Sequence, residues 1–132
     1  MIYSEGRRVF KVRHFDGWMR KTQLKDQALC KAVEEMAAGL IDADLGGFVV
    51  KKRVGLAGRG KRGGARTLVA TNKGSRWFFI FGFEKNERVN ISPTELEALQ
   101  ALAGDLLGMS AKRLGKAIKD GALQEICHDR KN

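Results

Sequence analysis

The stretch "ARTLVATNKGSRWFFIFGF", residues 65–83, contains a complete strand–turn–strand unit. Residues 65–71 and 76–83 are rich in β-branched and aromatic side chains, which favour strands, and "NKGS" at 72–75 has the composition of a tight turn. Residues 76–83 are apolar almost without interruption, as in a strand that is buried on both faces. We therefore expect an antiparallel hairpin with residues 76–83 near the centre of a sheet.

Further strand patterns lie on both sides of this hairpin. "GFVVKKRV" at 47–54 is β-branched and predicts the strand before it, and "RVFKVR" at 8–13 predicts a first strand with Phe10 and Val12 on one face. "ALQEI" at 122–126 is a candidate closing strand. The pattern predicts a three-stranded antiparallel meander to which the N-terminal strand is added.

Two helices are expected in the N-terminal third. Residues 14–23 form a short one, weakened by Gly17. Asp26 is the expected N-cap of a longer helix that ends at Gly39. Its apolar residues recur at helical spacing and predict a buried stripe: Leu29, Ala32, Val33, Met36 and Leu40.

Two more helices are expected after the meander. "SPTE" at 92–95 has the spacing of a capping box with proline in the first turn, and the apolar stripe after it runs to Gly108. Ser110 begins a second helix that stops at Gly121. The chain is thus predicted to be an α+β domain, a small antiparallel sheet with helices packed on it.

Positive charge is concentrated in the middle of the chain. The net charge is +10, and no acidic residue lies between Asp44 and Glu84. One face of the fold should therefore suit a polyanion. Nine basic residues occupy that segment: Lys51, Lys52, Arg53, Arg59, Lys61, Arg62, Arg66, Lys73 and Arg76.

The glycine-rich segment 55–66 is not predicted to bind a nucleotide. "GLAGRGKR" at 55–62 nearly matches a P-loop, but Arg62 replaces the hydroxyl residue, and both this motif and the dinucleotide fingerprint require a helix to follow. A strand follows here, so we expect a flexible connection that presents cations to a passing chain. His14 and His128 have no grouped carboxylates, and we expect neither a metal nor another cofactor.

The two cysteines, Cys30 and Cys127, form no CxxC motif and are predicted to be reduced thiols. The N-terminus has no apolar signal region, and no run of residues is long and apolar enough for a membrane span. We therefore expect a cytoplasmic protein.

Residues 45–92 resemble the core of RelE/ParE-superfamily toxins, the HigB-like branch in particular, most specifically through "GKRGGAR" at 60–66 followed by "FGFEKNE" at 81–87. The resemblance implies one RelE-like toxin domain over residues 1–126 and a disordered tail at 127–132. It also implies a toxin of a type II toxin–antitoxin system, a ribosome-dependent mRNA endonuclease, or mRNA interferase, that works without a metal and inhibits translation. Its partners would be the ribosome, mRNA and an antitoxin encoded by the adjacent gene.

The resemblance also implies site residues. Arg66 matches the family's strand arginine at the scissile phosphate, and Lys85 matches a second cation after the last strand. The family's tyrosine would fall near Ile91, a departure that could weaken the nuclease. Lys61 is therefore our predicted general base, since the cations around it favour its neutral form. The remaining cations of the segment are expected to bind RNA: Lys51, Lys52, Arg53, Arg59, Arg62, Lys73 and Arg76.

Two other functions fit the same residues. A basic sheet can bind RNA or ribosomes without cutting RNA. A ParE-like toxin would instead act on a DNA-processing enzyme.

Overall fold

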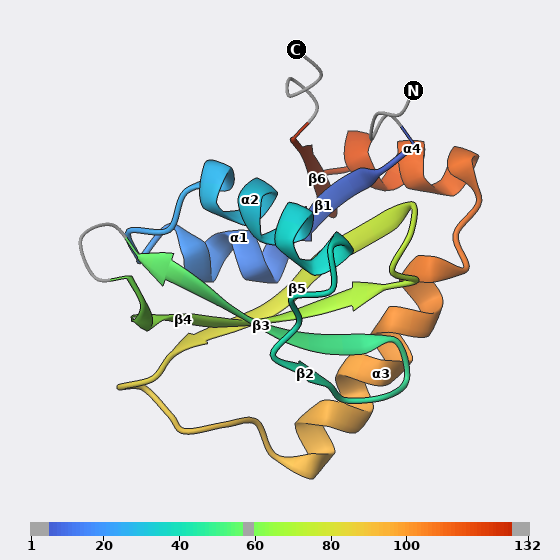
Figure 1. Cartoon of the computed structure of the whole chain (residues 1–132). Coiled ribbons are helices and arrows are strands. Elements are labelled where there is room, and N and C mark those ends of the chain that lie inside the picture. Colours follow the sequence, from blue (N-terminus) through green and yellow to red (C-terminus); the bar gives the residue numbers. More distant parts are fainter. Residues whose placement is uncertain (1–5, 57–59, 128–132) are drawn as a thin grey trace.

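A single sheet lies between two pairs of helices in the computed structural model (Figure 1). The structure describes residues 6–56 and 60–127, without the side chains of 60–63. The elements in chain order are β1 Arg8–Val12, α1 Arg13–Met19, α2 Asp26–Ala37, β2 Ala43–Asp44, β3 Val49–Leu56, β4 Gly60–Thr71, β5 Arg76–Glu84, α3 Pro93–Leu107, α4 Ala111–Lys119 and β6 Leu123–Ile126.

The sheet order is β2-β3-β4-β5-β1-β6. The predicted antiparallel meander β3-β4-β5 is confirmed. The sheet is larger than predicted, with six strands, and it is not wholly antiparallel, because β1 pairs with β5 in parallel. Phe10 of β1 stacks on Phe78 of β5 with ring centroids 4.8 Å apart, so the parallel register buries two large rings together.

Each face of the sheet packs on one pair of helices. One buried cluster joins α1 and α2 to the sheet through Phe15, Leu29 and Trp77, among others. The other cluster joins α3 and α4 to the opposite face through Leu106, Leu114 and others. Because β5 contributes buried residues to both clusters, the prediction that residues 76–83 form a central strand is confirmed.

The glycine-rich segment is largely strand, which corrects the expected flexible connection. β3 continues to Leu56, and β4 already begins at Gly60. Gly64 is required by the neighbouring strand, because a Cβ atom there would lie 2.2 Å from the backbone oxygen of Val54. Arg59 falls outside the described residues.

Several predicted helix signals are confirmed. Ser92 and Glu95 form the capping box of α3, and the Ser110 side chain accepts a hydrogen bond from the Arg113 backbone N–H at the start of α4. The prediction for Asp26 was wrong. Lys25 is the N-cap, and the Asp26 carboxylate instead accepts a hydrogen bond from Lys11 Nζ at 2.8 Å. Leu40 is also not in the buried stripe of α2, because it follows the helix end and is 60% exposed.

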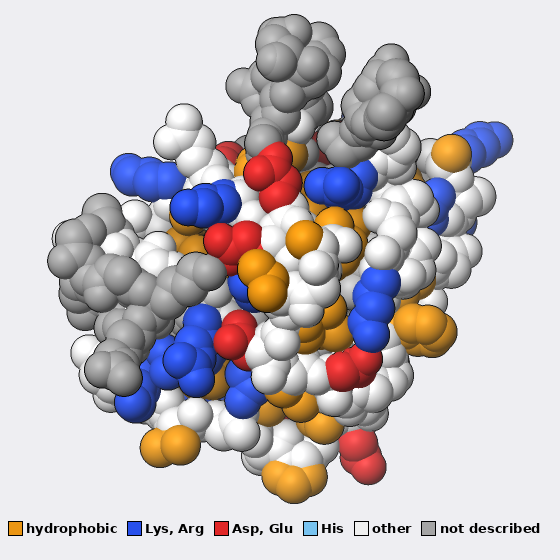
Figure 2. Space-filling view, viewed as in Figure 1, with side chains coloured by type: hydrophobic (Ala, Val, Ile, Leu, Met, Phe, Trp, Pro, Cys, Tyr) orange, Lys and Arg blue, Asp and Glu red, His pale blue; other side chains and the backbone are white. Residues whose placement is uncertain are grey.

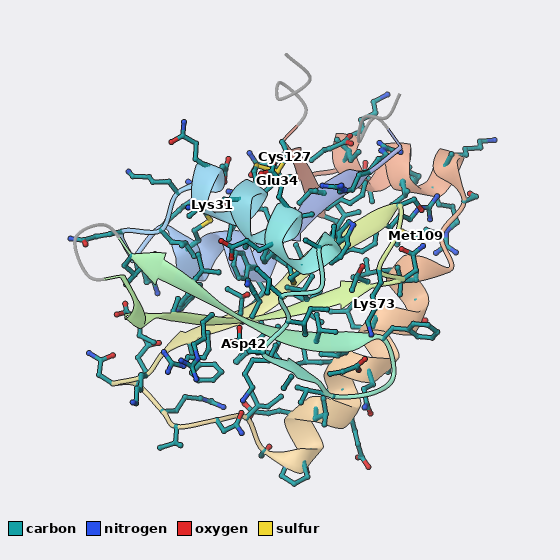
Figure 3. The ribbon with its side chains drawn as sticks, in the orientation of Figure 1. Lys31, Glu34, Asp42, Lys73, Met109 and Cys127 are labelled. Carbon is teal, nitrogen blue, oxygen red and sulfur yellow. A yellow bond between two sulfur atoms is a disulfide. The ribbon has the colours of Figure 1, made fainter. Side chains whose placement is uncertain are left out.

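Cys30 of α2 and Cys127, just after β6, form a disulfide, with Cα atoms 5.6 Å apart (Figure 3). The prediction of two reduced thiols was wrong, because the fold joins residues that are 97 positions apart in the sequence. Cys127 was also the expected first residue of the tail, and 128–132 lie outside the described residues. Over the described ranges, no helix has the length and apolar character needed to cross a membrane.

Candidate nucleic-acid interface

The sheet face that packs on α3 and α4 changes from apolar to basic along β3 and β4. Val49 and Leu68 are buried on this face. Because side chains alternate along a strand, Lys51 and Arg53 of β3 lie on the face of Val49, and Arg66 of β4 lies on the face of Leu68. We call Lys51, Arg53 and Arg66 the basic sheet face. Figure 2 shows Lys and Arg side chains gathered at the lower left, below β3 and β4 as they lie in Figure 1.

The strand register sets these residues in two rows. Arg53 lies opposite Arg66, and Arg66 lies opposite Phe83 of β5. In the next row, Lys51 lies opposite Leu68, which lies opposite Phe81. The basic side chains therefore stand on β3 and β4, and the aromatic rings stand beside them on β5.

The two arginines differ in their present contacts. Arg53 is half exposed and lies 3.8 Å from an Asp42 carboxylate oxygen. Within the described residues, the side chain of Arg66 makes one hydrogen bond, to the backbone oxygen of Gly64 at 3.4 Å. Both guanidinium groups thus keep donors for an anion, and arginine can bind phosphate through two parallel hydrogen bonds.

Lys85 follows directly after β5, at the same end of the sheet as Arg66. The last residue of β5, Glu84, pairs with Ala65, which precedes Arg66. A tight turn follows, in which the Glu84 backbone N–H donates to Glu87 Oε1 at 2.6 Å and the Glu87 N–H donates to the Glu84 oxygen at 2.8 Å. Lys85 is exposed in this turn. Lys85 therefore lies just beyond the end of β5, two residues after Phe83, which pairs with Arg66 in the middle of β4.

Beside this face lies a group of aromatic and cationic side chains that the sequence patterns did not predict: His14, Phe81 and Arg88. The His14 ring stacks on Phe81, and the Arg88 guanidinium carbon lies 5.6 Å from the Phe81 centroid. Arg88 is held by Glu95 at 2.6 Å, and this hydrogen bond lowers the pKa of the Glu95 carboxyl. Phe81 lies inside an apolar run, so no signal in the sequence separates it from the core.

Three of the predicted RNA-binding residues lie apart from the basic sheet face. Lys52 points to the opposite face, where it is buried, pairs with Glu35 at 2.9 Å and donates to the Leu40 backbone oxygen. Successive side chains on a strand point to opposite faces, so Lys52 points away from Lys51 and Arg53. This corrects the expectation that all three extend one basic patch.

Lys73 and Arg76 lie where β4 ends and β5 begins, far along the strands from Lys85. Lys73 is in the β4–β5 turn, where it pairs with Asp44 at 2.6 Å, and Figure 3 places it on the same side of the molecule as Met109. Arg76 donates to the Met109 backbone oxygen. Lys61 and Arg62 lie on β4, but their side chains are outside the described part of the chain.

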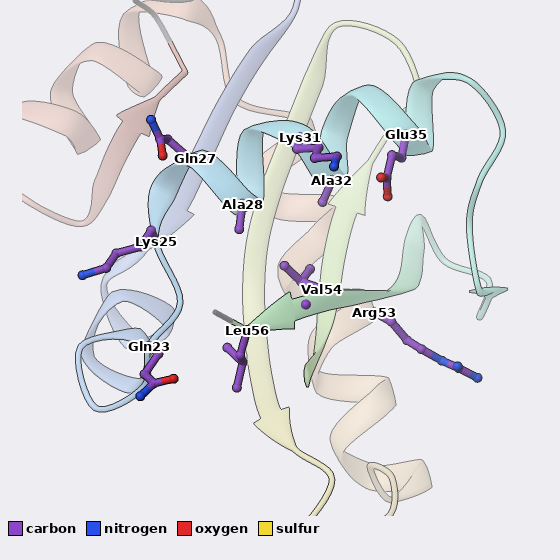
Figure 4. Close-up of a pocket in the computed structure, with 11 residues that line it drawn as sticks. Gln23, Lys25, Gln27, Ala28, Lys31, Ala32, Glu35, Arg53, Val54 and Leu56 are labelled. Atoms are coloured by element: carbon purple, nitrogen blue, oxygen red, sulfur yellow. The ribbon is translucent and has the colours of Figure 1, made fainter. Parts of the chain in front are cut away.

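A pocket of about 410 Å³ lies on the other side of the sheet, between α2 and the end of β3 (Figure 4). Ala28 and Ala32 of α2 face Val54 and Leu56 of β3 across it. Its charged lining on α2 and just before it comprises Lys25, Lys31 and Glu35. Arg53 reaches only the rim, and Figure 4 shows its side chain directed away from the pocket. No group of three or more His, Cys, Asp or Glu side chains that could hold a metal occurs among the residues described.

The fold and the site define a class: a small basic α+β domain with basic residues gathered on one face of its sheet. In a comparison with protein families, the model of the RelE toxin of the RelE/RelB toxin–antitoxin system matches residues 7–126. The chain belongs to the RelE toxin family and is the toxin of a toxin–antitoxin system, with an antitoxin as its partner. Comparison with curated proteins found no match.

Proposed function

We propose that this toxin is a ribosome-dependent mRNA endonuclease of the HigB-like branch, which inhibits translation by cutting mRNA. The observation that supports this most is the direct opposition of Arg53 and Arg66 on one face. Like charges opposite each other on paired strands are destabilising, so such a pair is useful where an anion lies between them. A phosphate group of RNA meets this need.

The chemistry proposed is attack of a ribose 2′-OH on the adjacent phosphate. The reaction needs a base for that hydroxyl, a proton for the departing 5′-oxygen, and cations for the charge that grows on the phosphorane. We assign the charge role to Arg66 and Lys85 and the base role to Lys61. Lys51, Arg53, Arg59 and Arg62 would hold the RNA backbone on either side.

The test uses purified toxin and ribosomes programmed with one defined mRNA. Replacing Arg66 with alanine should slow cleavage by roughly 10²- to 10³-fold, the scale for removing one preorganised charge partner. The products should end in 2′,3′-cyclic phosphates, and cutting should persist with EDTA at levels that leave the ribosomes intact. Lys119→Ala, on the exposed side of α4, is the matched cation control.

Two outcomes would contradict this function. Binding of wild-type toxin to programmed ribosomes without any cut would favour the non-catalytic binding module. Inhibition of a DNA-processing enzyme with intact mRNA would favour a ParE-like toxin.

We further propose that the pocket beside α2 receives an acidic, partly apolar segment of the antitoxin. The pocket combines apolar walls with cations, and beyond Arg53 the outer edge of β3 pairs with no other strand in the described ranges. An extended peptide could add to this edge. Lys25→Glu with Lys31→Glu should weaken antitoxin binding, whereas Lys112→Glu on α4 should not. Unchanged affinity in the double variant would place the antitoxin elsewhere.

A further inference from the structure

The His14 side chain is an exposed ring at the edge of the basic sheet face. Its ring centroid lies 5.7 Å from that of Phe81, and the two ring planes differ by 11°. The contact follows from the topology, because β1 runs parallel to β5 and α1 begins directly after β1. The N-terminal turn of α1 thereby reaches the half-buried Phe81.

This stack is close to the proposed phosphate contact. Phe81 lies opposite Leu68, two residues along β4 from Arg66, so Phe81 and Arg66 are diagonal neighbours on one face. Diagonal neighbours in an antiparallel pair lie about 7–8 Å apart. The sugar and base of one nucleotide can cover that separation, so a phosphate at Arg66 leaves the next base near the two rings.

The surroundings of the stack also suit RNA. Arg88 lies over Phe81 and is kept in place by its ion pair with Glu95, so its guanidinium plane is held against the ring. An exposed imidazole on a phenyl ring offers a flat surface with polar edges. Proteins that bind single-stranded RNA use aromatic and histidine rings in this way to stack bases.

We propose that the His14–Phe81 stack is a nucleobase-binding subsite, in which an unpaired base of the RNA stacks on the outer face of the His14 ring. The proposal rests on the proposed function, because it assumes that RNA lies on the basic sheet face. It makes His14 a positioning residue that holds one base while the neighbouring phosphate lies at Arg66. Stacking on the ring alone would accept any base. Hydrogen bonds between the imidazole nitrogens and the edge of the base would add a preference for some bases.

The experiment measures stacking directly. A short single-stranded RNA with 2-aminopurine at successive positions is titrated with the full-length toxin, and the quenching of its fluorescence reports base stacking. His14→Ala should lose the quenching at one position and bind roughly 5- to 150-fold more weakly, the range for one base–aromatic stack. His14→Phe should keep most of both, because it retains a ring.

The matched control is Phe48→Asn. Phe48 is also an exposed ring, 60% accessible, but it precedes β3 at the end opposite Arg53. This change should leave quenching and affinity as in the wild type. Thermal unfolding of each variant checks that the fold is kept.

Cleavage mapping on programmed ribosomes separates the two proposals. If the wild type cuts mRNA and His14→Ala cuts at the same sites and rate with equal quenching, the subsite is overturned and the nuclease remains. If the wild type does not cut but shows ring-dependent quenching, the nuclease fails and the subsite stands. Loss of quenching in Phe48→Asn as well would overturn the subsite.

Discussion

Arg53 of β3 and Arg66 of β4 lie directly opposite each other on one face of an antiparallel pair. Directly opposed like charges cost about 0.2–1 kcal/mol of stability. Substitutions in this pair should therefore change RNA affinity and the free energy of unfolding in different directions.

Replacing Arg53 with glutamine should weaken RNA binding while leaving the free energy of unfolding unchanged or slightly higher. The repulsion between the two arginines is removed, and the Asp42 contact that is lost is long, at 3.8 Å. The slope of log K against log salt should fall by about 0.7 for each lost contact to a single-stranded phosphate. Filter binding at several salt concentrations measures it. An unchanged slope would exclude Arg53 from the phosphate contacts.

Lys52→Gln should behave in the opposite way, although it is the next residue. Lys52 is buried and pairs with Glu35 on the face of α2. Removing one member of a buried pair leaves the other uncompensated, and we expect a loss of about 3 kcal/mol in the free energy of unfolding. Urea denaturation measures this loss, and RNA affinity per folded molecule should not change. A stable variant with weak RNA binding would return Lys52 to the interface.

Arg66→Lys should recover only part of the cleavage lost in Arg66→Ala. A lysine keeps the charge but cannot make two parallel hydrogen bonds to one phosphate.

Lys85→Ala should slow cleavage by roughly 10²- to 10³-fold. Single-turnover rates on programmed ribosomes give both values. Full activity of Lys85→Ala would leave Arg66 without the second cation proposed here.

Gly64→Ala should destabilise the protein by about 1–3 kcal/mol, because its Cβ atom would meet the backbone of Val54 rather than a side chain that can move. It should also reduce cleavage, since the strands would separate beside Arg53 and Arg66. Gly104→Ala is the control. No atom lies within 4 Å of its added Cβ in α3, so it should stabilise by up to about 1 kcal/mol. Thermal unfolding compares them, and equal midpoints would contradict the close approach.

Asp16 should make stability depend on pH in the acidic range. Its hydrogen bond to the buried Lys11, 2.7 Å long, is the main cause that lowers the pKa of the Asp16 carboxyl, and Arg20 adds to it. In the range below about pH 4 the unfolded chain then binds more protons at this position than the native one, so stability falls as pH falls. Asp16→Asn should be less stable at pH 7, and its difference from the wild type should shrink below pH 4. A constant difference would contradict the role of this pair.

Local structure could be predicted from the sequence because its hydrogen bonds join residues a few positions apart. The capping box of Ser92 and Glu95, the helix start at Ser110 and the turn at 72–75 all follow from nearby residues. The strand 76–83 could be predicted for another reason, because its unbroken apolar run indicates burial on both faces. The concentration of basic residues between Asp44 and Glu84 is likewise a property of the chain alone. These patterns determined an α+β fold with one basic region.

Only the tertiary structure decided which of those cations lie together on one face. The composition of "KKR" at 51–53 is uniform, but strand alternation sends Lys52 to α2 and leaves Lys51 and Arg53 beside Arg66. The disulfide from Cys30 to Cys127 and the stack of His14 on Phe81 join segments that are distant in the sequence. Both depend on the position of β1 between β5 and β6. Strand order depends on which buried faces pack best together. A local sequence pattern cannot predict this packing, because the partner strand comes from a distant part of the chain.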